Sequence, residues 1–134
     1  IQASELIVNP DGSIFHLHLK PEEIADTILL VGDQNRVDVV AEFFESIEVT
    51  KQNREFRTIT GIYNGKRITV ISTGIGTDNI DIVLNELDAA VNFDLEKRTS
   101  KKELKHIALS LTQLSINLLQ NYKYCFLLIN FATL

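Results

Sequence analysis

The segment Leu29–Arg36, which reads LLVGDQNR, decides the fold because it leads an apolar strand straight into a glycine turn and then an arginine. Gly32 exposes a backbone amide, and Arg36 supplies a planar cation that can donate two hydrogen bonds to one oxyanion. The pattern therefore suits phosphate. It fits equally well an ordinary strand and turn with a solvent-facing arginine, which many α/β proteins have without any ligand.

The residues around this segment alternate between strand and helix patterns. Thr27–Val31 has the β-branched and leucine content of a short buried strand, and Val37–Phe44 has the apolar spacing of a helix that packs on a sheet. Three further strands are predicted at Ile47–Thr50, Arg57–Tyr63 and Arg67–Ser72. Asn64 and Gly65 supply the positive φ of a two-residue hairpin turn between the last two. This order predicts an α/β fold with a mixed β-sheet, part of it antiparallel.

Further along, the chain has the periodicity of helices. Apolar residues recur at helical spacing over Asp78–Val91, with Asp78 as the expected N-cap. Ser100 and Glu103 form a Ser-x-x-Glu capping box, and helical spacing continues over Leu104–Leu118. The sequence therefore predicts two more helices, the second of them in the tail.

Composition and charge exclude several classes of protein. The chain has 134 residues, 45% of them hydrophobic, and a formal net charge of −5, which argues against a nucleic-acid surface of clustered lysine and arginine. The single cysteine, Cys125, fits a reducing cytosol, and no secretory signal is visible, so we expect a cytoplasmic protein. The most apolar stretch, Tyr124–Leu134, is shorter than the ~20 apolar residues that span a bilayer, so no membrane partner is expected.

Three more segments accompany LLVGDQNR: FHLHL at Phe15–Leu19, NREFRTITG at Asn53–Gly61 and STGIGTDN at Ser72–Asn79. In this order the four segments resemble the nucleoside phosphorylase family, especially its uridine phosphorylase branch. The resemblance runs roughly from Ser4 to Glu103. It implies the N-terminal half of a three-layer α/β/α fold, with a mixed sheet and flanking helices.

Past Glu103 the resemblance stops. The family would continue there into a strand and a Gly-Thr-Ser-Gly loop that completes the phosphate site, and residues 104–134 resemble neither. We expect residues 1–103 to be the N-terminal part of a nucleoside phosphorylase domain and residues 104–134 to be a divergent, truncated or frame-shifted tail that is helical and apolar. The polar stretch Asp94–Lys102 is the expected boundary.

The resemblance implies roles for several motif residues. Gly32 and Arg36 would contact phosphate, and Arg54 would reach the phosphate of a neighbouring subunit. His16 would be lent across a dimer interface to the ribose 5′-hydroxyl of the adjacent site. The alternatives are that Arg36 caps or salt-bridges its own helix, that Arg54 is solvated on a strand and that His16 is a surface residue. Asp33 is expected to bond nearby backbone, and no catalytic residue is assigned.

Similar uridine phosphorylases can hold a monovalent cation at the dimer interface, using a glutamate, a loop carbonyl and a hydroxyl. The matching positions are Glu55, Ile75 and Asn79. Asn79 departs from the expected serine, although its amide oxygen can still coordinate a hard cation. The alternative is that Glu55 is a plain salt-bridge partner. His16 and His18 lie two positions apart but lack a Cys or carboxylate at ligand spacing, so no other metal site is expected.

The activity implied by the resemblance is transfer of a pentosyl group from a nucleoside to inorganic phosphate, the co-substrate, without a required cofactor. A homo-oligomer is expected, since full-length relatives are hexamers built from dimers. The base-recognition residues, the ribose-binding pair and the remaining phosphate ligands of the family lie in a C-terminal half that this sequence lacks. Whether this chain is active by itself is therefore left open.

Two alternatives accompany this interpretation. One is a nucleoside hydrolase of the same fold, against which Arg36 and Arg54 speak, because a hydrolase has no phosphate dianion to neutralise. The other is a non-catalytic partner subunit of a full-length homologue, which the apolar tail supports, because an uncovered apolar helix tends to bind a surface.

Overall fold

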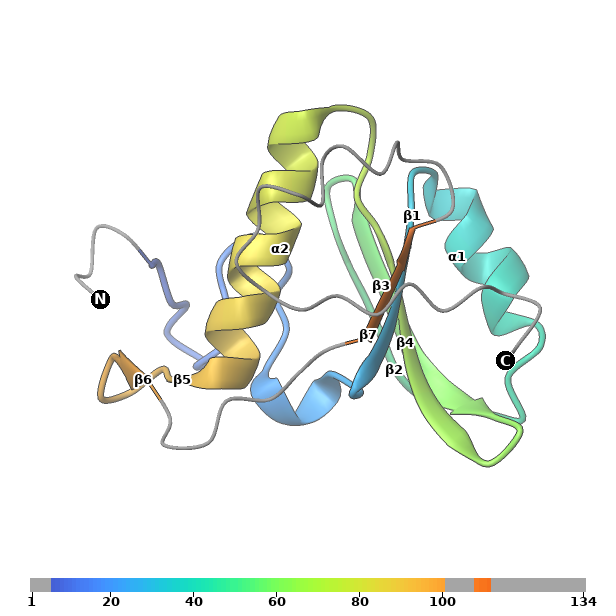
Figure 1. Cartoon of the computed structure of the whole chain (residues 1–134), viewed down its shortest axis with the longest axis horizontal. Coiled ribbons are helices and arrows are strands. Elements are labelled where there is room, and N and C mark those ends of the chain that lie inside the picture. Colours follow the sequence, from blue (N-terminus) through green and yellow to red (C-terminus); the bar gives the residue numbers. More distant parts are fainter. Residues whose placement is uncertain (1–5, 101–107, 112–134) are drawn as a thin grey trace.

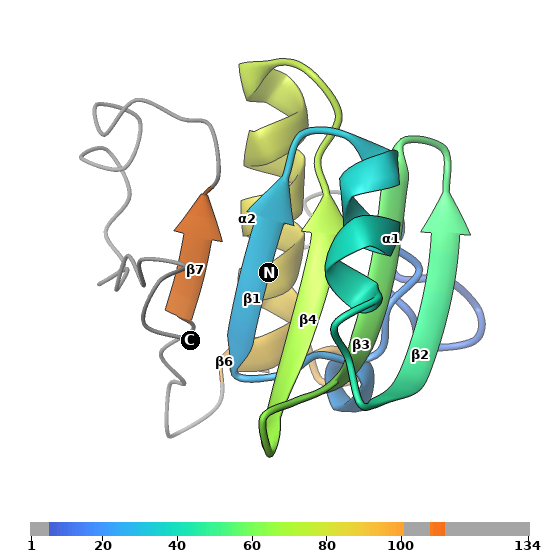
Figure 2. The ribbon, with the colours of Figure 1, turned by 90° about the vertical axis from the view of Figure 1, so that its right-hand side faces the viewer.

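A computed structural model describes residues 6–100 and 108–111, which form three layers (Figure 1). A mixed sheet is the middle layer, with α1 (Gln34–Ala41) on one face and α2 (Thr77–Asn92) on the other, as Figure 2 shows. The predicted α/β fold with a mixed sheet and flanking helices is therefore confirmed. Within the described residues, no helix is long and apolar enough to cross a membrane.

The sheet joins an antiparallel half to a parallel half. In spatial order its strands are β2 (Ser46–Asn53), β3 (Phe56–Tyr63), β4 (Lys66–Ser72), β1 (Thr27–Val31) and β7 (Ala108–Leu111). β2, β3 and β4 are antiparallel neighbours, whereas β1 runs parallel to both β4 and β7. Outside this sheet lie the single-turn helix η1 (Pro21–Glu23) and a ribbon of β5 (Phe93–Asp94) with β6 (Thr99–Ser100).

Two tight turns build the antiparallel half. Asn64 and Gly65 have φ angles of 48° and 75° between β3 and β4, which confirms the predicted hairpin turn. A second two-residue turn, made by Arg54 and Glu55, joins β2 to β3 and was not predicted. Arg54 has a φ of 53°, a left-handed conformation that is uncommon for any residue other than glycine.

α1 begins at Gln34, earlier than the predicted start at Val37. The reason is the cap: the Asp33 carboxylate accepts a hydrogen bond of 2.9 Å from the Asn35 amide, which satisfies a donor of the first turn. The backbone-bonding role expected for Asp33 is therefore observed.

Phe44, predicted as the last residue of this helix, follows the helix end at Ala41 and packs against the sheet. It lies over a glycine of β3. A Cβ added to Gly61 would stand 2.4 Å from the Ser46 carbonyl oxygen and 2.6 Å from Cδ2 of Phe44. Glycine is needed here because the backbone of β2 and an aromatic ring occupy the space of a side chain.

α2 begins at Thr77, and its N-cap is Gly76 rather than the predicted Asp78. Gly76 has a φ of 119°, which residues with side chains rarely adopt, so the chain turns into the helix before Asp78 is reached. Asp78 lies in the first turn, where its negative charge interacts favourably with the helix dipole.

Alternate residues of β1 point into two separate cores. Ile28 and Leu30 belong to the core between the sheet, α2 and the N-terminal segment, whereas Leu29 and Val31 belong to the core beneath α1. All four side chains are buried. Burial on both faces explains the unbroken apolar run in this strand.

The predicted tail helix over Leu104–Leu118 is wrong at Ala108–Leu111, where the chain forms β7. β7 pairs in parallel with β1 and so gives hydrogen-bond partners to the second edge of that strand. This long-range pairing outweighs the local helical periodicity. Residues 104–134 were expected to lack a strand like the one with which the family continues after this point, and β7 corrects that expectation.

Other predictions for the tail are only partly covered by the structure. Ser100 belongs to β6 and pairs with Phe93, so it is not a helix cap. Glu103, the rest of the predicted tail helix and the apolar stretch Tyr124–Leu134 with Cys125 lie outside the described residues. The division into residues 1–103 and 104–134 stays a prediction.

Replacing Gly61 by alanine is expected to lower the free energy of unfolding by about 1–3 kcal/mol, because the new methyl must displace a backbone oxygen and a ring. Gly32→Ala is the matched control. Its Cβ would meet only the Gly74 carbonyl oxygen, at 4.0 Å, so the change should be below about 0.5 kcal/mol. Urea unfolding followed by circular dichroism measures both, and equal midpoints would contradict the packing described for β3.

Candidate functional site

The loops that follow β1 and β4 lie side by side at the carboxyl edge of the sheet. The Thr73 amide donates a hydrogen bond of 2.8 Å to the carbonyl of Val31, the last residue of β1. A Cβ on Gly32 would lie 4.0 Å from the Gly74 carbonyl oxygen. From these adjacent loops α1 and α2 leave toward opposite faces of the sheet (Figure 2). This edge is where open α/β sheets bind their ligands.

The backbone does not require a glycine at position 32. Gly32 has no left-handed φ, and an added Cβ would make only an ordinary van der Waals contact. A side chain as small as alanine would therefore fit at this position without strain.

Arg36 stands in the first turn of α1, just beyond the Asp33 cap, and its side chain is exposed. In residues 6–100, charge pairing separates the arginines into two groups. Arg57, Arg67 and Arg98 each donate to a carboxylate or a backbone carbonyl at 2.6–2.7 Å. The guanidinium groups of Arg36 and Arg54 form no hydrogen bond or ion pair with any group of residues 6–100. The alternative of a salt bridge between Arg36 and its own helix is thus not found in the described part of the chain.

Arg54 lies on a turn that is fastened to the start of α1. Nε2 of Gln34 donates a hydrogen bond of 3.1 Å to the Arg54 carbonyl, and Nε2 of Gln52 donates one of 2.8 Å to Oε1 of Gln34. The Arg54 side chain is exposed on this left-handed turn, and backbone strain of this kind concentrates at functional sites. The structure brings the Arg54 backbone next to the helix turn that carries Arg36.

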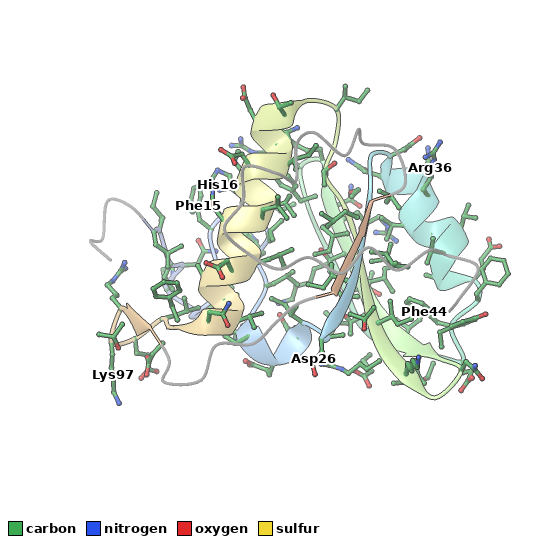
Figure 3. All side chains as sticks on the ribbon, in the orientation of Figure 1. Phe15, His16, Asp26, Arg36, Phe44 and Lys97 are labelled. Atoms are coloured by element: carbon green, nitrogen blue, oxygen red, sulfur yellow. The ribbon has the colours of Figure 1, made fainter. Side chains whose placement is uncertain are left out.

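His16 is not brought to these arginines within one chain. Figure 3 places it beside α2, on the opposite side of the molecule from Arg36 on α1. The segment Phe15–Leu19 is a turn, because His18 has a φ of 54° and its amide donates a hydrogen bond of 2.9 Å to the Ile14 carbonyl. The extended geometry that would put both imidazoles on one face is therefore absent from this segment.

Glu86 is the partner of His16 and was missed in the sequence. Its carboxylate lies 2.6 Å from Nδ1 of the imidazole and also accepts hydrogen bonds from the His16 and Leu17 amides. Glu86 is 7% exposed, on the buried face of α2. The sequence did contain a signal for it: Glu86 lies one helical turn from Val83 and Ala90, on the apolar side of the predicted amphipathic helix. A charge at such a position needs partners.

The three predicted cation ligands lie around the loop after β4. A Cβ on Gly74 would stand 2.9 Å from Nδ2 of Asn79 and 3.0 Å from Cγ of Glu55, so both side chains flank this glycine. Ile75 follows it and is 98% exposed. The Glu55 carboxylate has no ion pair within residues 6–100, so the salt-bridge alternative is not observed there. Nowhere in the described part of the chain do three His, Cys, Asp or Glu side chains gather in a way that could hold a metal ion.

Comparisons with known proteins converge on one family. Residues 26–97 match the family model of the phosphorylase superfamily. DeoD-type purine nucleoside phosphorylases of Alkaliphilus metalliredigens and Bacillus velezensis are 48% and 41% identical over 73 residues, which is 54% of this chain and 31% and 32% of those proteins. The chain thus spans about a third of the length of these relatives.

Solved structures agree with the sequence comparison. A Trypanosoma brucei nucleoside phosphorylase, described as showing uridine phosphorylase activity, superposes with a TM-score of 0.70 at 38% identity, over 80% of this chain and 38% of that one. A uridine phosphorylase of Phytophthora capsici gives 0.64 at 26% identity, over 78% and 32%. With its family model, its relatives and its fold in agreement, the chain belongs to the phosphorylase superfamily, among the purine nucleoside and uridine phosphorylases.

Proposed function

We propose that this chain carries the phosphate-binding part of a nucleoside phosphorylase, in which a pentosyl group passes from a nucleoside to inorganic phosphate. The observation that supports the proposal best is that the guanidinium groups of Arg36 and Arg54 have no partner within residues 6–100. The Arg54 carbonyl accepts a hydrogen bond from Gln34, at the start of the helix that carries Arg36. On a chain of net charge −5, two guanidinium groups that have no partner within residues 6–100 favour anionic ligands.

The proposed chemistry needs a phosphate held against the anomeric carbon of the pentose. As the bond to the base breaks, the sugar acquires oxocarbenium character, and the phosphate oxygen forms the new bond. The Gly32 amide and the Arg36 fork would orient the dianion, and Arg54 would complete the charge balance at a neighbouring site. The same cations favour phosphorolysis over hydrolysis, because water brings no charge to neutralise. No catalytic residue is proposed within this chain.

The finer parts of the proposal rest on the motifs. The Phe15–Leu19 and Asn53–Gly61 segments and the similarity to the Trypanosoma brucei protein support the uridine branch and a place in nucleoside salvage in the cytoplasm. A homo-oligomer is supported by His16, which lies on the opposite side of the molecule from the Arg36 loop and would serve an adjacent site. The partners proposed are a nucleoside, phosphate and further copies of the chain.

Arg36→Ala is expected to weaken binding of inorganic phosphate about tenfold or more, because a charge-assisted hydrogen bond contributes about 1.5–3 kcal/mol. Arg36→Lys should lose less, since it keeps the charge but not the fork. Isothermal titration calorimetry at fixed ionic strength measures both. Lys66→Ala, an exposed cation in the β3–β4 hairpin, controls for net charge and should bind as the unaltered protein does. Undetectable phosphate binding by the unaltered protein, or equal affinities in all variants, would refute the assignment.

Arg54→Gly separates stability from function at the left-handed turn. Relief of the φ of 53° should raise the free energy of unfolding by about 0.5–1 kcal/mol, while phosphate affinity falls. Asn64→Gly, at the matching φ of 48° in the other hairpin, should stabilise less, because asparagine tolerates this region better, and should leave phosphate binding alone. Urea midpoints measure the stability of both variants, and phosphate titrations measure their affinity. A destabilised Arg54→Gly variant would contradict the claim that Arg54 strains the backbone of this turn.

We also propose a monovalent cation at the dimer interface, beside Gly74, held by the Glu55 carboxylate, the Ile75 carbonyl and the Asn79 amide oxygen. A half-turn of the Asn79 amide would present its oxygen without changing the shape of the side chain. Potassium chloride should then raise the melting temperature above that in choline chloride of equal ionic strength. Glu55→Gln should abolish the difference. A difference of the same size in that variant would rule out this ligand set.

A further inference from the structure

We infer that Glu86 is a positioning residue for His16: it fixes the place of the imidazole and the nitrogen that carries its proton, so that Nε2 is presented as an acceptor to a pentose hydroxyl. This inference rests on the proposed phosphorylase function and adds to it a residue from α2, an element that the motif comparison did not involve in pentose binding.

The contact joins residues 70 positions apart through three donors on one carboxylate. Oε1 of Glu86 lies 2.6 Å from Nδ1 of His16. The His16 amide lies 3.0 and 3.1 Å from the two carboxylate oxygens, and the Leu17 amide lies 3.0 Å from Oε2. The Glu86 side chain is 9% exposed and that of His16 is 33% exposed. The carboxylate thus lies deep while the ring stays accessible.

This geometry selects one form of the neutral ring. An ionised carboxylate only accepts hydrogen bonds, so Nδ1 must be the donor. In a neutral imidazole Nε2 is then unprotonated and can accept. Within residues 6–100 Nε2 has no hydrogen-bond partner, so its lone pair is available to a hydroxyl group.

The orientation of the ring is fixed from other sides as well. Nδ2 of Asn53 donates a hydrogen bond of 2.8 Å to the His16 carbonyl, so the backbone is held at both its amide and its carbonyl. The ring meets Phe15 and the buried Phe56 edge to face, with centroid distances of 4.9 and 6.3 Å. A site supported by a rigid helix and a locked rotamer holds its geometry better than one on a loop alone.

The ring also borders space that a ligand or a neighbouring subunit could enter. His16, Phe15 and Glu86 line an open hollow of about 660 Å³, together with Asp81 and Asn85 of α2. In Figure 3, Phe15 and His16 lie beside α2 on the outer side of the molecule. The position agrees with a histidine that serves a site outside its own chain.

A purely structural role for Glu86 would need only its hydrogen bonds to the two backbone amides. The test must therefore measure the hydrogen bond between the Glu86 carboxylate and Nδ1 of His16. Long-range ¹H–¹⁵N spectra report which imidazole nitrogen carries the proton, and the ¹⁵N shifts themselves show when the ring is neutral. We expect protonated Nδ1 in the unaltered protein and loss of that preference in Glu86→Gln. Asp88→Asn removes a charge from the same helix, where Asp88 binds Asn92 instead, and should leave the His16 signals unchanged. A proton on Nε2 in the unaltered protein overturns the inference without any variant.

Binding experiments then test whether Glu86 acts through His16. Glu86→Gln and His16→Ala should each weaken the binding of ribose 1-phosphate roughly three- to tenfold, which corresponds to the loss of one neutral hydrogen bond. The affinity for inorganic phosphate should stay the same. In the double variant the two losses should not add. Full additivity would show a merely structural role and overturn the inference. Failure of the unaltered protein to bind either compound would overturn the proposed function itself. The nitrogen spectra need no ligand, so they test the contact between Glu86 and His16 independently of that outcome.

Discussion

The parallel pairing of β1 with β4 is the constraint on which the rest of the site depends. Its register runs from Thr27 opposite Ile68 to Val31 opposite Ser72, so both strands end at the same level. The two glycine loops must therefore start side by side, and the hydrogen bond from Thr73 to Val31 holds them there. Burial of β1 between two cores makes this register costly to shift, since a slip of one residue would exchange the side chains of the two faces.

Electrostatics gives this edge its character. The chain is acidic overall, and most of its described arginines are engaged by carboxylates or carbonyls, yet Arg36 and Arg54 are exposed and have no partner within residues 6–100. Both stand on tightly specified backbone: one follows a capped helix start and the other occupies a left-handed turn. Under the proposed function, this firmly held backbone would keep both side chains ready for an external anion.

The buried Glu86 carboxylate holds the more exposed imidazole of His16 in place. Glu86 occupies a place on α2 where an apolar side chain would be the simpler choice, and its carboxylate is compensated by three donors from one turn of chain. Such a buried carboxylate stabilises one arrangement of its surroundings more than it stabilises the fold as a whole. The N-terminal turn is therefore joined to α2 and, through Asn53, to the end of β2.

Local signals in the sequence determined much of this architecture. The apolar run of β1, the Asn64-Gly65 turn, the helical spacing before Val91 and the motif order that resembles the phosphorylases all depend on neighbours in the chain. Helix ends were less predictable: Asp33 and Gly76, rather than Val37 and Asp78, set the starts, because caps depend on the backbone angles of single residues.

Long-range contacts decided what no local pattern could. β7 formed at Ala108–Leu111 despite helical spacing, because the free edge of β1 offered hydrogen bonds that a helix there would leave unmade. The pairing of His16 with Glu86 likewise joins residues 70 positions apart in the chain. The sequence by itself indicated candidate residues for phosphate and pentose. Only the tertiary structure decided that Arg36 and Arg54 have no partner within residues 6–100 and that His16 lies on the opposite side of the molecule, since both depend on which distant groups come within bonding distance.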